Sequence, residues 1–256
     1  MYSVDINCDL GENFGSYILP NQDVLFDYIS SANIACGFHA GDPDVMQYTV
    51  AKAIEKKVAI GAHPGFYDIQ GFGRRAIYMT PKEVYNMVLY QIGALYGFVK
   101  AAGGRLHHVK PHGALYNMAA RDKNLATAIA QAVFDFDQQL YLYGLAGSEL
   151  IAAANKIGLP AASEVFADRT YQDNGGLTSR SQDNAVITDA LQAIRQVSLM
   201  ITQQQVASIN QQLIRIKADT LCIHGDNAQA LLLTKNIHNH LLKEGITIKA
   251  PSNEAD

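Results

Sequence analysis

The chain has 256 residues, is nearly half apolar and carries a formal net charge of −4. Its charges form no long runs, so we expect neither a nucleic-acid-binding stripe nor a membrane-binding face. It also lacks an apolar run near the roughly 20 residues of a membrane span and the basic start of a signal peptide, which predicts a soluble, cytoplasmic protein.

Strand-like apolar runs alternate with helical patterns along the whole chain. In chain order we predict strand 3–9, strand 32–37, helix 44–56, strand 58–62, helix 80–102, strand 106–110, helix 121–134, strand 140–145, helix 148–156, strand 162–167, helix 188–204, a small hairpin within 205–218, strand 219–223 and helix 227–244. The helix at 80–102 is the clearest, because Thr80-Pro81-Lys82-Glu83 is a capping box and Gly103-Gly104 ends it. No composition shift or repeat marks a boundary, so we predict a single domain over residues 1–256.

This alternation implies parallel strands joined by crossover helices, which can form either an open sheet or a closed barrel. In an open sheet the polar residues gather at one switch point, whereas nearly every strand here ends in polar residues. Such a pattern is expected at the C-terminal rim of a barrel. We therefore predict an α/β fold, a seven-stranded (β/α) barrel with its site at that rim.

Histidine recurs in one local setting, at the end of an apolar run and beside Gly, Pro or Asp. The four stretches are ACGFHAGD (35–42), GAHPG (61–65), VKPHGALYN (109–117) and CIHGD (222–226). The last residue of a buried strand can face the open mouth of a barrel. One such residue is more often a core or capping histidine, but four indicate a shared site. We expect the four to meet there: His39, His63, His112 and His224.

The first strand carries Asp5, Asn7 and Asp9 on one face. Buried carboxylates need partners or a function. We interpret Asp5 as a hydrogen-bonded plug of the barrel and Asp9, nearer the rim, as a functional residue.

Three residues of the fourth strand region, His108, Lys110 and His112, also share a face. His108 and His112 have the spacing of a metal pair, but Pro111 forbids a helix and a strand would separate them by about 13 Å, so we expect no joint chelation. The Lys110 ammonium needs either a neighbouring carboxylate, such as Asp9 or Glu164, or an anionic substrate. We predict the substrate, so that Lys110→Met slows turnover by about 10²–10³-fold while stability stays near that of the wild type.

Two loops that follow strands carry arginines. GFGRR (71–75) and DRTYQDNGGLTSR (168–180) place Arg74 and Arg169 where a substrate carboxylate could be clamped, although each could equally be a solvated surface residue. Asp226 could bind substrate or cap the last helix. The cysteines Cys8, Cys36 and Cys222 form no CxxC pair and are interpreted as buried thiols in a reducing compartment.

Long segments of the chain resemble the LamB/YcsF family. They span residues 5 to 226 and are DINCDLGENFG, SSANIACGFHAGDP, VAIGAHPGFYDIQGFGRR, LYQIGALYGF, HHVKPHGALYN, GLAGSELI, EVFADRTY and DTLCIHGD. Motifs this long and numerous are highly specific. The departures, residues 177–180 and a short Gln-rich hairpin at 203–212, both lie in predicted loops.

The resemblance implies a barrel related to glycoside hydrolase and deacetylase folds. It also implies ATP-dependent hydrolysis of the lactam 5-oxo-L-proline to L-glutamate, in a complex with 5-oxoprolinase subunits B and C. The catalytic residues would be Asp9, His63, Lys110 and His112. The substrate-binding residues would be Glu12, His39, Arg74, Glu164, Arg169, His224 and Asp226.

Several points stay open at the level of sequence. GxxxxGK[ST], GxGxxG, GxSxG and HExxH are all absent, so contact between ATP and this chain is not decided. One alternative is a divalent-metal deacetylase or amidohydrolase with Asp9, His39 and His63 as ligands, although the primary interpretation assigns no metal ligand. Another alternative is a non-catalytic lactam-binding protein. A homo-oligomer is neither required nor excluded.

Overall fold

Parallel strands close into a barrel in the computed structural model, which describes residues 2–19, 22–179, 182–223 and 228–252. Each strand pairs with the next, and the last pairs with the first. The barrel strands are β1 (Ser3–Leu10), β2 (Ser31–Ala35), β3 (Ala59–His63), β4 (Leu106–Val109), β5 (Tyr141–Leu145), β6 (Ala161–Phe166) and β9 (Thr220–Cys222). The predicted seven-stranded (β/α) barrel is confirmed.

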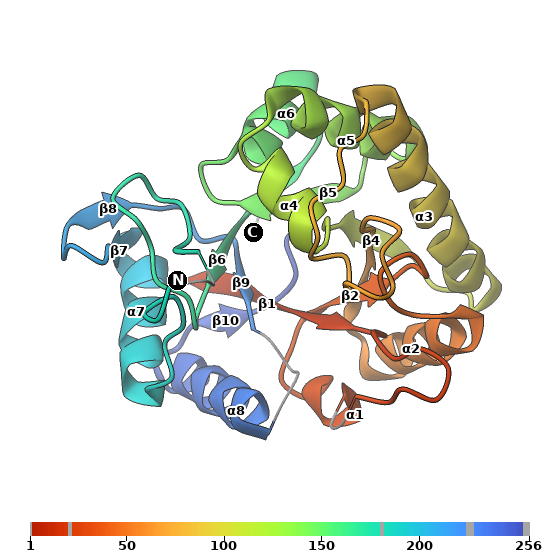
Figure 1. The fold of residues 1–256 in the computed structure, drawn as a ribbon. Coiled ribbons are helices and arrows are strands. Elements are labelled where there is room, and N and C mark those ends of the chain that lie inside the picture. Colours follow the sequence, from red (N-terminus) through yellow and green to blue (C-terminus); the bar gives the residue numbers. More distant parts are fainter. Residues whose placement is uncertain (1, 20–21, 180–181, 224–227, 253–256) are drawn as a thin grey trace.

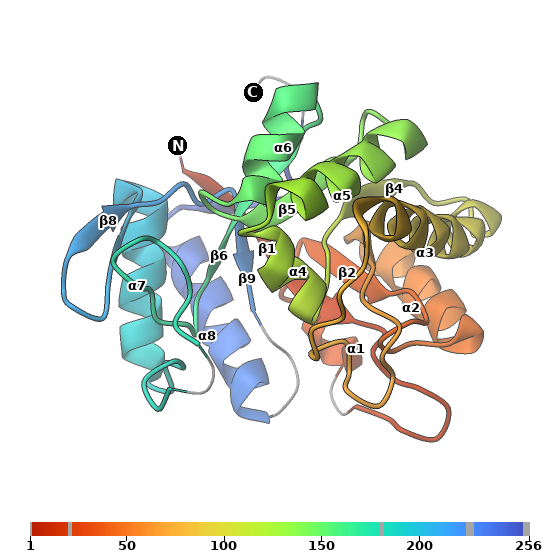
Figure 2. The ribbon, with the colours of Figure 1, turned by 45° about the horizontal axis from the view of Figure 1, so that its top comes forward.

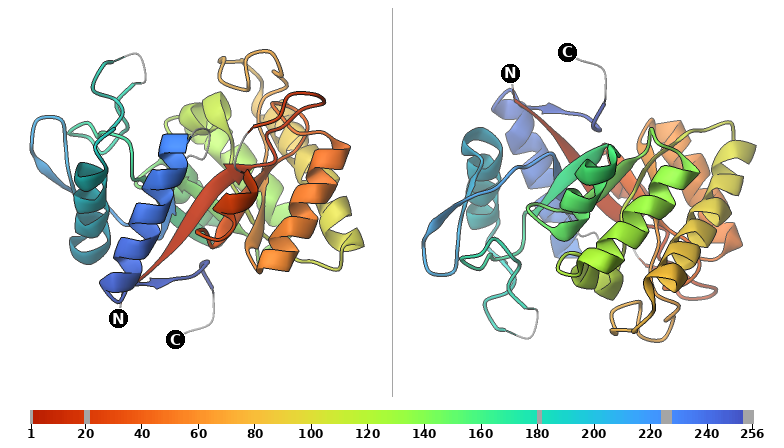
Figure 3. Two further views of the ribbon diagram at one scale, coloured as in Figure 1. Left: turned by 90° about the horizontal axis from the view of Figure 1, so that it is seen from below. Right: turned by 90° about the horizontal axis from the view of Figure 1, so that it is seen from above.

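Helices surround the barrel on the outside (Figure 1). They are α2 (Pro43–Lys56), α3 (Pro81–Ala101), α5 (Lys123–Phe136), α6 (Glu149–Ile157), α7 (Ala190–Gln203) and α8 (Ala228–Lys243). The antiparallel hairpin of β7 (Gln205–Ala207) and β8 (Leu213–Arg215), which was predicted, lies beside α7 (Figure 2). A short strand, β10 (Thr247–Ile248), pairs with the start of β1, and the two lie side by side in both views of Figure 3.

Two short helices were not predicted. These are α1 (Gln22–Leu25) and α4 (Gly113–Ala119). The α4 helix begins directly after His112, within a stretch that was interpreted only as the end of a strand. Gly113 has φ +55°, a backbone conformation that glycine adopts without strain, and this permits the abrupt change from strand to helix.

Local sequence explains the best-predicted helix. The Thr80 hydroxyl accepts a hydrogen bond from the Glu83 amide, and the Glu83 carboxylate accepts one from the Thr80 amide, so α3 begins with a complete capping box. Buried residues then recur every three or four positions from Val84 to Val99. This stripe packs α3 into the main hydrophobic core.

The inside of the barrel is polar. On β1, the even positions from Val4 to Leu10 belong to the hydrophobic core, whereas Asp5 and Asn7 are buried among polar groups. Asp5 accepts hydrogen bonds from Ser30, Ser31 and Thr220, so its predicted role as a plug is confirmed. Burial raises the pKa of Asp5 despite these bonds.

Two further expectations concern the thiols and the membrane. The three cysteines are buried and form no disulfide with one another. Among the residues that the structure describes, no helix combines the length and the apolar character that a bilayer crossing requires.

Candidate functional site

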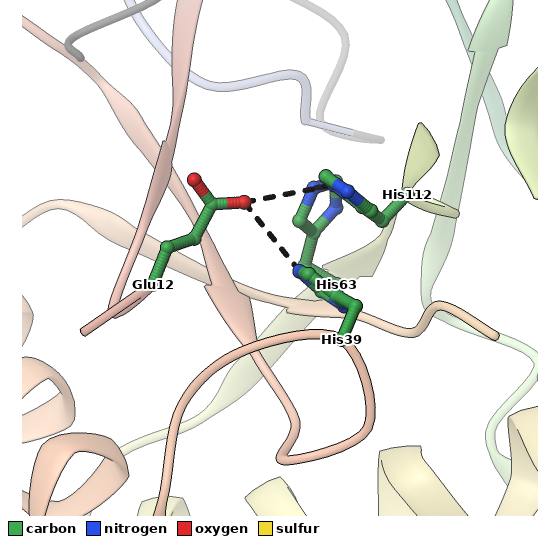
Figure 4. A group of neighbouring side chains, drawn as sticks. All are labelled: Glu12, His39, His63 and His112. Carbon is green, nitrogen blue, oxygen red and sulfur yellow. Dashed lines mark hydrogen bonds and ion pairs between the residues drawn. The ribbon is translucent and has the colours of Figure 1, made fainter. Parts of the chain in front are cut away.

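Four predicted site residues converge at the rim of the barrel. Glu12 follows β1, His39 follows β2, His63 ends β3 and His112 follows β4. One ligand atom from each lies within 4.8 Å of the corresponding atom of the other three, and Figure 4 shows the side chains directed at a common point. We call these four residues the rim cluster. All four are buried.

Backbone carbonyls orient two of the imidazoles. His63 Nδ1 lies 2.7 Å from the Lys110 carbonyl oxygen, and His112 Nε2 lies 2.9 Å from that of Phe72. A carbonyl only accepts, so each of these ring nitrogens carries a hydrogen and donates it. The opposite nitrogens, His63 Nε2 and His112 Nδ1, therefore face each other across 2.9 Å.

The third imidazole is packed rather than hydrogen-bonded. The His39 ring stacks on that of His112, with centroids 3.8 Å apart and planes 3° apart. A Cβ at Gly65 would lie 2.6 Å from His39 Nδ1, and one at Gly73 would lie 2.7 Å from His39 Cβ. The glycines of GAHPG and GFGRR thus leave the space that His39 occupies.

A second group of charges lies beneath the rim cluster. Lys110 Nζ donates to Asn7 Oδ1 and Asp9 Oδ1, each at 3.0 Å, and forms an ion pair of 2.7 Å with Glu164 Oε1. The Tyr116 hydroxyl donates to the other Glu164 oxygen at 2.6 Å. The sequence left open whether Lys110 pairs with a carboxylate or with substrate. In the structure it pairs with both candidate carboxylates, Asp9 and Glu164.

Asp9 joins the two groups. Its Oδ1 accepts from Lys110 and Asn33, and its Oδ2 lies 3.4 Å from His63 Nε2. Burial alone would raise the Asp9 pKa, but the interactions with His63 and with the Lys110 ammonium outweigh it and hold the pKa well below its ordinary value. Burial would lower the Lys110 pKa, but Asp9, Cys222 and Glu164 hold it well above its ordinary value.

Three residues of the rim cluster, His39, His112 and Glu12, have pKa values shifted toward their uncharged forms. Burial, followed by the interaction with His63, lowers the pKa of His39 well below its ordinary value. Burial, followed by His39 and His63, does the same to the pKa of His112. Burial, together with the nearby Asp9 charge, raises the pKa of Glu12. Neutral imidazoles keep their lone pairs, so these side chains could hold a metal cation.

The remaining predicted substrate-binding residues lie in different environments. Arg74 is exposed, and its guanidinium carbon lies 5.0 Å from the ring centroid of Phe72, the residue whose carbonyl holds His112. Arg169 is buried and donates to the carbonyls of Ala185 and Thr178, which orders its own loop. His224 and Asp226 lie outside the described residues. Roles for these four in substrate binding stay predictions.

The structure changes the membership of the metal set considered from the sequence. Asp9 is not part of the rim cluster, and Glu12 and His112 are. His108 also lies apart, stacked on Tyr143 and bonded to Asn33, which agrees with the expectation that it does not chelate together with His112.

Sequence reasoning missed three contacts in the group of charges around Lys110. Asn33 bonds Asp9, Tyr116 bonds Glu164, and Cys222 Sγ lies 3.2 Å from Lys110 Nζ. The available signal was weak. Asn33 is a polar residue in an apolar strand, Tyr116 lies four residues after His112, and Cys222 was interpreted only as a buried thiol.

Known proteins similar to this chain agree with the fold and cover nearly its whole length. A protein of Shouchella clausii, named as the A subunit of 5-oxoprolinase, is 58% identical over 250 residues, 98% of this chain and 99% of that one. The crystal structure of a lactam utilization protein from Thermus thermophilus superimposes with a TM-score of 0.93 at 43% identity, covering 97% of this chain and 100% of that chain. The catalytic domain of a peptidoglycan N-acetylglucosamine deacetylase from Eubacterium rectale has a TM-score of 0.51 at 10% identity, covering 98% and 90%, and shares the fold alone.

The family follows from a match that is nearly as long as the chain. The LamB/YcsF family profile matches residues 4–256. Together with the full-length relatives, this match confirms the resemblance seen in the strand-end motifs. The chain belongs to the LamB/YcsF family.

Proposed function

We propose that this chain is the A subunit of a multi-subunit 5-oxoprolinase and hydrolyses 5-oxo-L-proline to L-glutamate with consumption of ATP. The observation that carries the proposal is the 58% identity to a 5-oxoprolinase A subunit over almost all of both chains. A name of this kind implies further subunits, and we propose subunits B and C as the partners.

Ring opening breaks the amide C–N bond of a five-membered lactam. Water adds to the carbonyl carbon, the ring nitrogen leaves with a proton as the amine, and a carboxylate forms. An amide is a poor electrophile, so we propose that transfer of the ATP γ-phosphoryl group to the amide oxygen, with release of ADP, precedes the attack of water. Departure of the ring nitrogen as the amine then leaves an acyl phosphate, which a second water hydrolyses to the carboxylate and inorganic phosphate. No GxxxxGK[ST] loop occurs in this sequence, so we assign the binding of ATP to the assembled complex rather than to a motif of this chain.

The rim offers a base for the attacking water. The low pKa of Asp9 keeps it ionised, and Oδ2 points toward His63, on the side away from Lys110. We assign the water proton to Asp9, with His63 and His112 lining the place where the water is held. Lys110 fixes Asp9 and, between two carboxylates, is proposed to balance negative charge that develops nearby.

The substrate also carries a free carboxylate that must be held. Arg74 is exposed and follows the loop segment that supports His112, and a planar guanidinium can hold a carboxylate by two hydrogen bonds, which supports this role. We assign the carboxylate clamp to Arg74.

A second candidate function is metal-dependent amide hydrolysis without ATP. The rim cluster is the observation that favours it, since three imidazoles and a carboxylate are typical ligands of a hydrolytic metal. A lactam-binding protein without catalytic residues is the third candidate.

One assay separates the three candidates. Glutamate release from 5-oxoproline is measured for this chain alone and with subunits B and C, with and without ATP. We expect release only from the assembled complex with ATP, and loss of release in Asp9→Asn. Asp122→Asn, at the N-cap of α5, serves as the control. Release without ATP would favour the metal enzyme, unchanged release in Asp9→Asn would favour the passive binding protein, and no release at all would refute the proposal.

A further inference from the structure

The rim cluster leaves buried polar atoms without hydrogen-bond partners. Glu12 Oε1 and both ring nitrogens of His39 form no hydrogen bond, although the His39 residue is only 1% exposed. A buried polar group without a partner is costly, and such groups usually bind water or an ion that satisfies them.

The facing ring nitrogens of His63 and His112 also lack a hydrogen between them when both rings are neutral. Backbone carbonyls take the N–H groups of His63 and His112, so neutral rings direct two lone pairs at each other across 2.9 Å. A single proton between them would relieve this one contact. It would still leave Glu12 Oε1 and His39 Nε2, which are 3.4 Å apart, without hydrogen-bond partners. A multivalent cation at the common point would satisfy all four atoms.

We propose that Glu12, His39, His63 and His112 bind one divalent first-row transition metal ion, of which Zn²⁺ is the probe ion. The ligand atoms are Glu12 Oε1, His39 Nε2, His63 Nε2 and His112 Nδ1. A role of this ion in turnover rests on the proposed function, whereas its binding does not.

Distances within the rim cluster fit such an ion. Ligand bonds of about 2.1 Å in a tetrahedral arrangement separate the ligand atoms by about 3.4 Å. The observed separations are 2.9 Å between His63 and His112, 3.4 Å between His39 and Glu12, and 3.6 Å between His112 and Glu12. The remaining separations are at most 4.8 Å, so the four ligand atoms surround a space somewhat larger than a metal ion requires, and side-chain rotations would bring them to bonding distance.

The chemistry of the ligands selects the class of metal. Imidazole nitrogen favours zinc, nickel, copper or iron, whereas magnesium and calcium prefer oxygen ligands. Metal-bound histidines also commonly donate their other N–H to a carboxylate or a backbone carbonyl, which fixes the ring. His63 and His112 do this through Lys110 and Phe72.

A second pair of facing histidines provides a matched comparison. His107 and His108 direct their Nδ1 atoms at each other across 3.1 Å, while His107 Nε2 donates to Pro251 and His108 Nε2 to Asn33. No carboxylate or third imidazole joins this pair in a metal-sized group among the described residues. Two ligand atoms are fewer than a transition-metal site requires, so we expect this pair to bind no metal.

The test measures Zn²⁺ binding directly, on tag-free full-length chain that has been stripped with EDTA. Elemental analysis after dialysis and titration against a chromophoric zinc chelator give stoichiometry and affinity. We expect one equivalent of Zn²⁺, not displaced by excess Mg²⁺. His39→Ala should weaken binding by at least about 100-fold, since loss of outer-sphere contacts alone costs 10–100-fold. His107→Gln should bind as the wild type does.

Controls keep the result independent of folding and of the reaction. Far-UV circular dichroism and melting temperature of the stripped variants establish that His39→Ala is folded, and Glu12→Gln provides a second ligand variant. Replacement by Co²⁺ should produce visible ligand-field bands that His39→Ala lacks. A folded wild-type chain that binds no Zn²⁺, or a His39→Ala variant that binds it unchanged, would overturn the metal site. Glutamate release is measured separately, so failure of ring opening would refute the proposed function while leaving the metal site standing.

Discussion

Replacing Lys110 by methionine removes a positive charge from between two carboxylates. The Lys110 side chain is 4% exposed, that of Glu164 is fully buried and that of Asp9 is 17% exposed. Removing one partner of a buried ion pair costs about 3–5 kcal/mol, because the other charge is left buried and uncompensated. Each kcal/mol lowers the melting temperature of a chain of this size by about 2–4 °C, so we expect a fall of roughly 6–20 °C. This prediction differs from the one made from sequence, that Lys110→Met would leave stability near that of the wild type, because the structure shows both carboxylates paired with Lys110.

Urea denaturation followed by circular dichroism measures this effect. The double variant Lys110→Met/Glu164→Gln should recover part of the loss, since the amide carries no charge and can still accept the Tyr116 hydroxyl. Lys52→Met is the control, because Lys52 pairs with Glu55 at the surface of α2 and should give no resolvable change. A Lys110→Met chain that unfolds at the wild-type urea concentration would refute the reasoning, as would a double variant less stable than the single one.

Three further predictions address the reaction, pH dependence and packing. Asp9→Asn should abolish ATP-dependent glutamate release and keep the melting temperature within a few degrees, because Lys110 retains Glu164; a large fall in melting temperature would contradict this. Burial, and then the charge of His107, lowers the pKa of His108, so the folded chain keeps it neutral while the unfolded chain protonates it below about pH 6.5. In metal-free buffer the free energy of unfolding should therefore decrease as the pH is lowered from about 7 to about 5, and the decrease should be smaller in His108→Gln. Equal decreases in the two chains would contradict this role of His108. Gly61→Ala should destabilise the fold by about 1–3 kcal/mol, because the added Cβ would overlap the His108 ring. Gly93→Ala has open space around its Cβ and should stabilise α3 by about 0.5–1 kcal/mol. Urea midpoints that move in the opposite directions would contradict these two predictions.

Local sequence patterns were sufficient to predict the architecture and the edge of the barrel where the site lies. Strand and helix patterns have local causes, such as the alternation from Val4 to Asp9 and the capping box at Thr80. Parallel strands joined by crossover helices put all strand ends of one kind at the same rim, so the convergence of His39, His63 and His112 follows from their common position.

The contacts that each of these side chains makes at the rim depend instead on segments that are distant in the chain. Glu12 lies beyond the end of β1 and enters the rim cluster through the path of its loop, which no periodicity specifies. The tautomers of His63 and His112 depend on carbonyls of Lys110 and Phe72, 47 and 40 residues away in the chain. Backbone carbonyls carry no residue-specific signal, so their contacts cannot be read from residue types. For the same reason the pairing of Lys110 with both Asp9 and Glu164, instead of with substrate alone, emerged only when three separate strand regions were brought together.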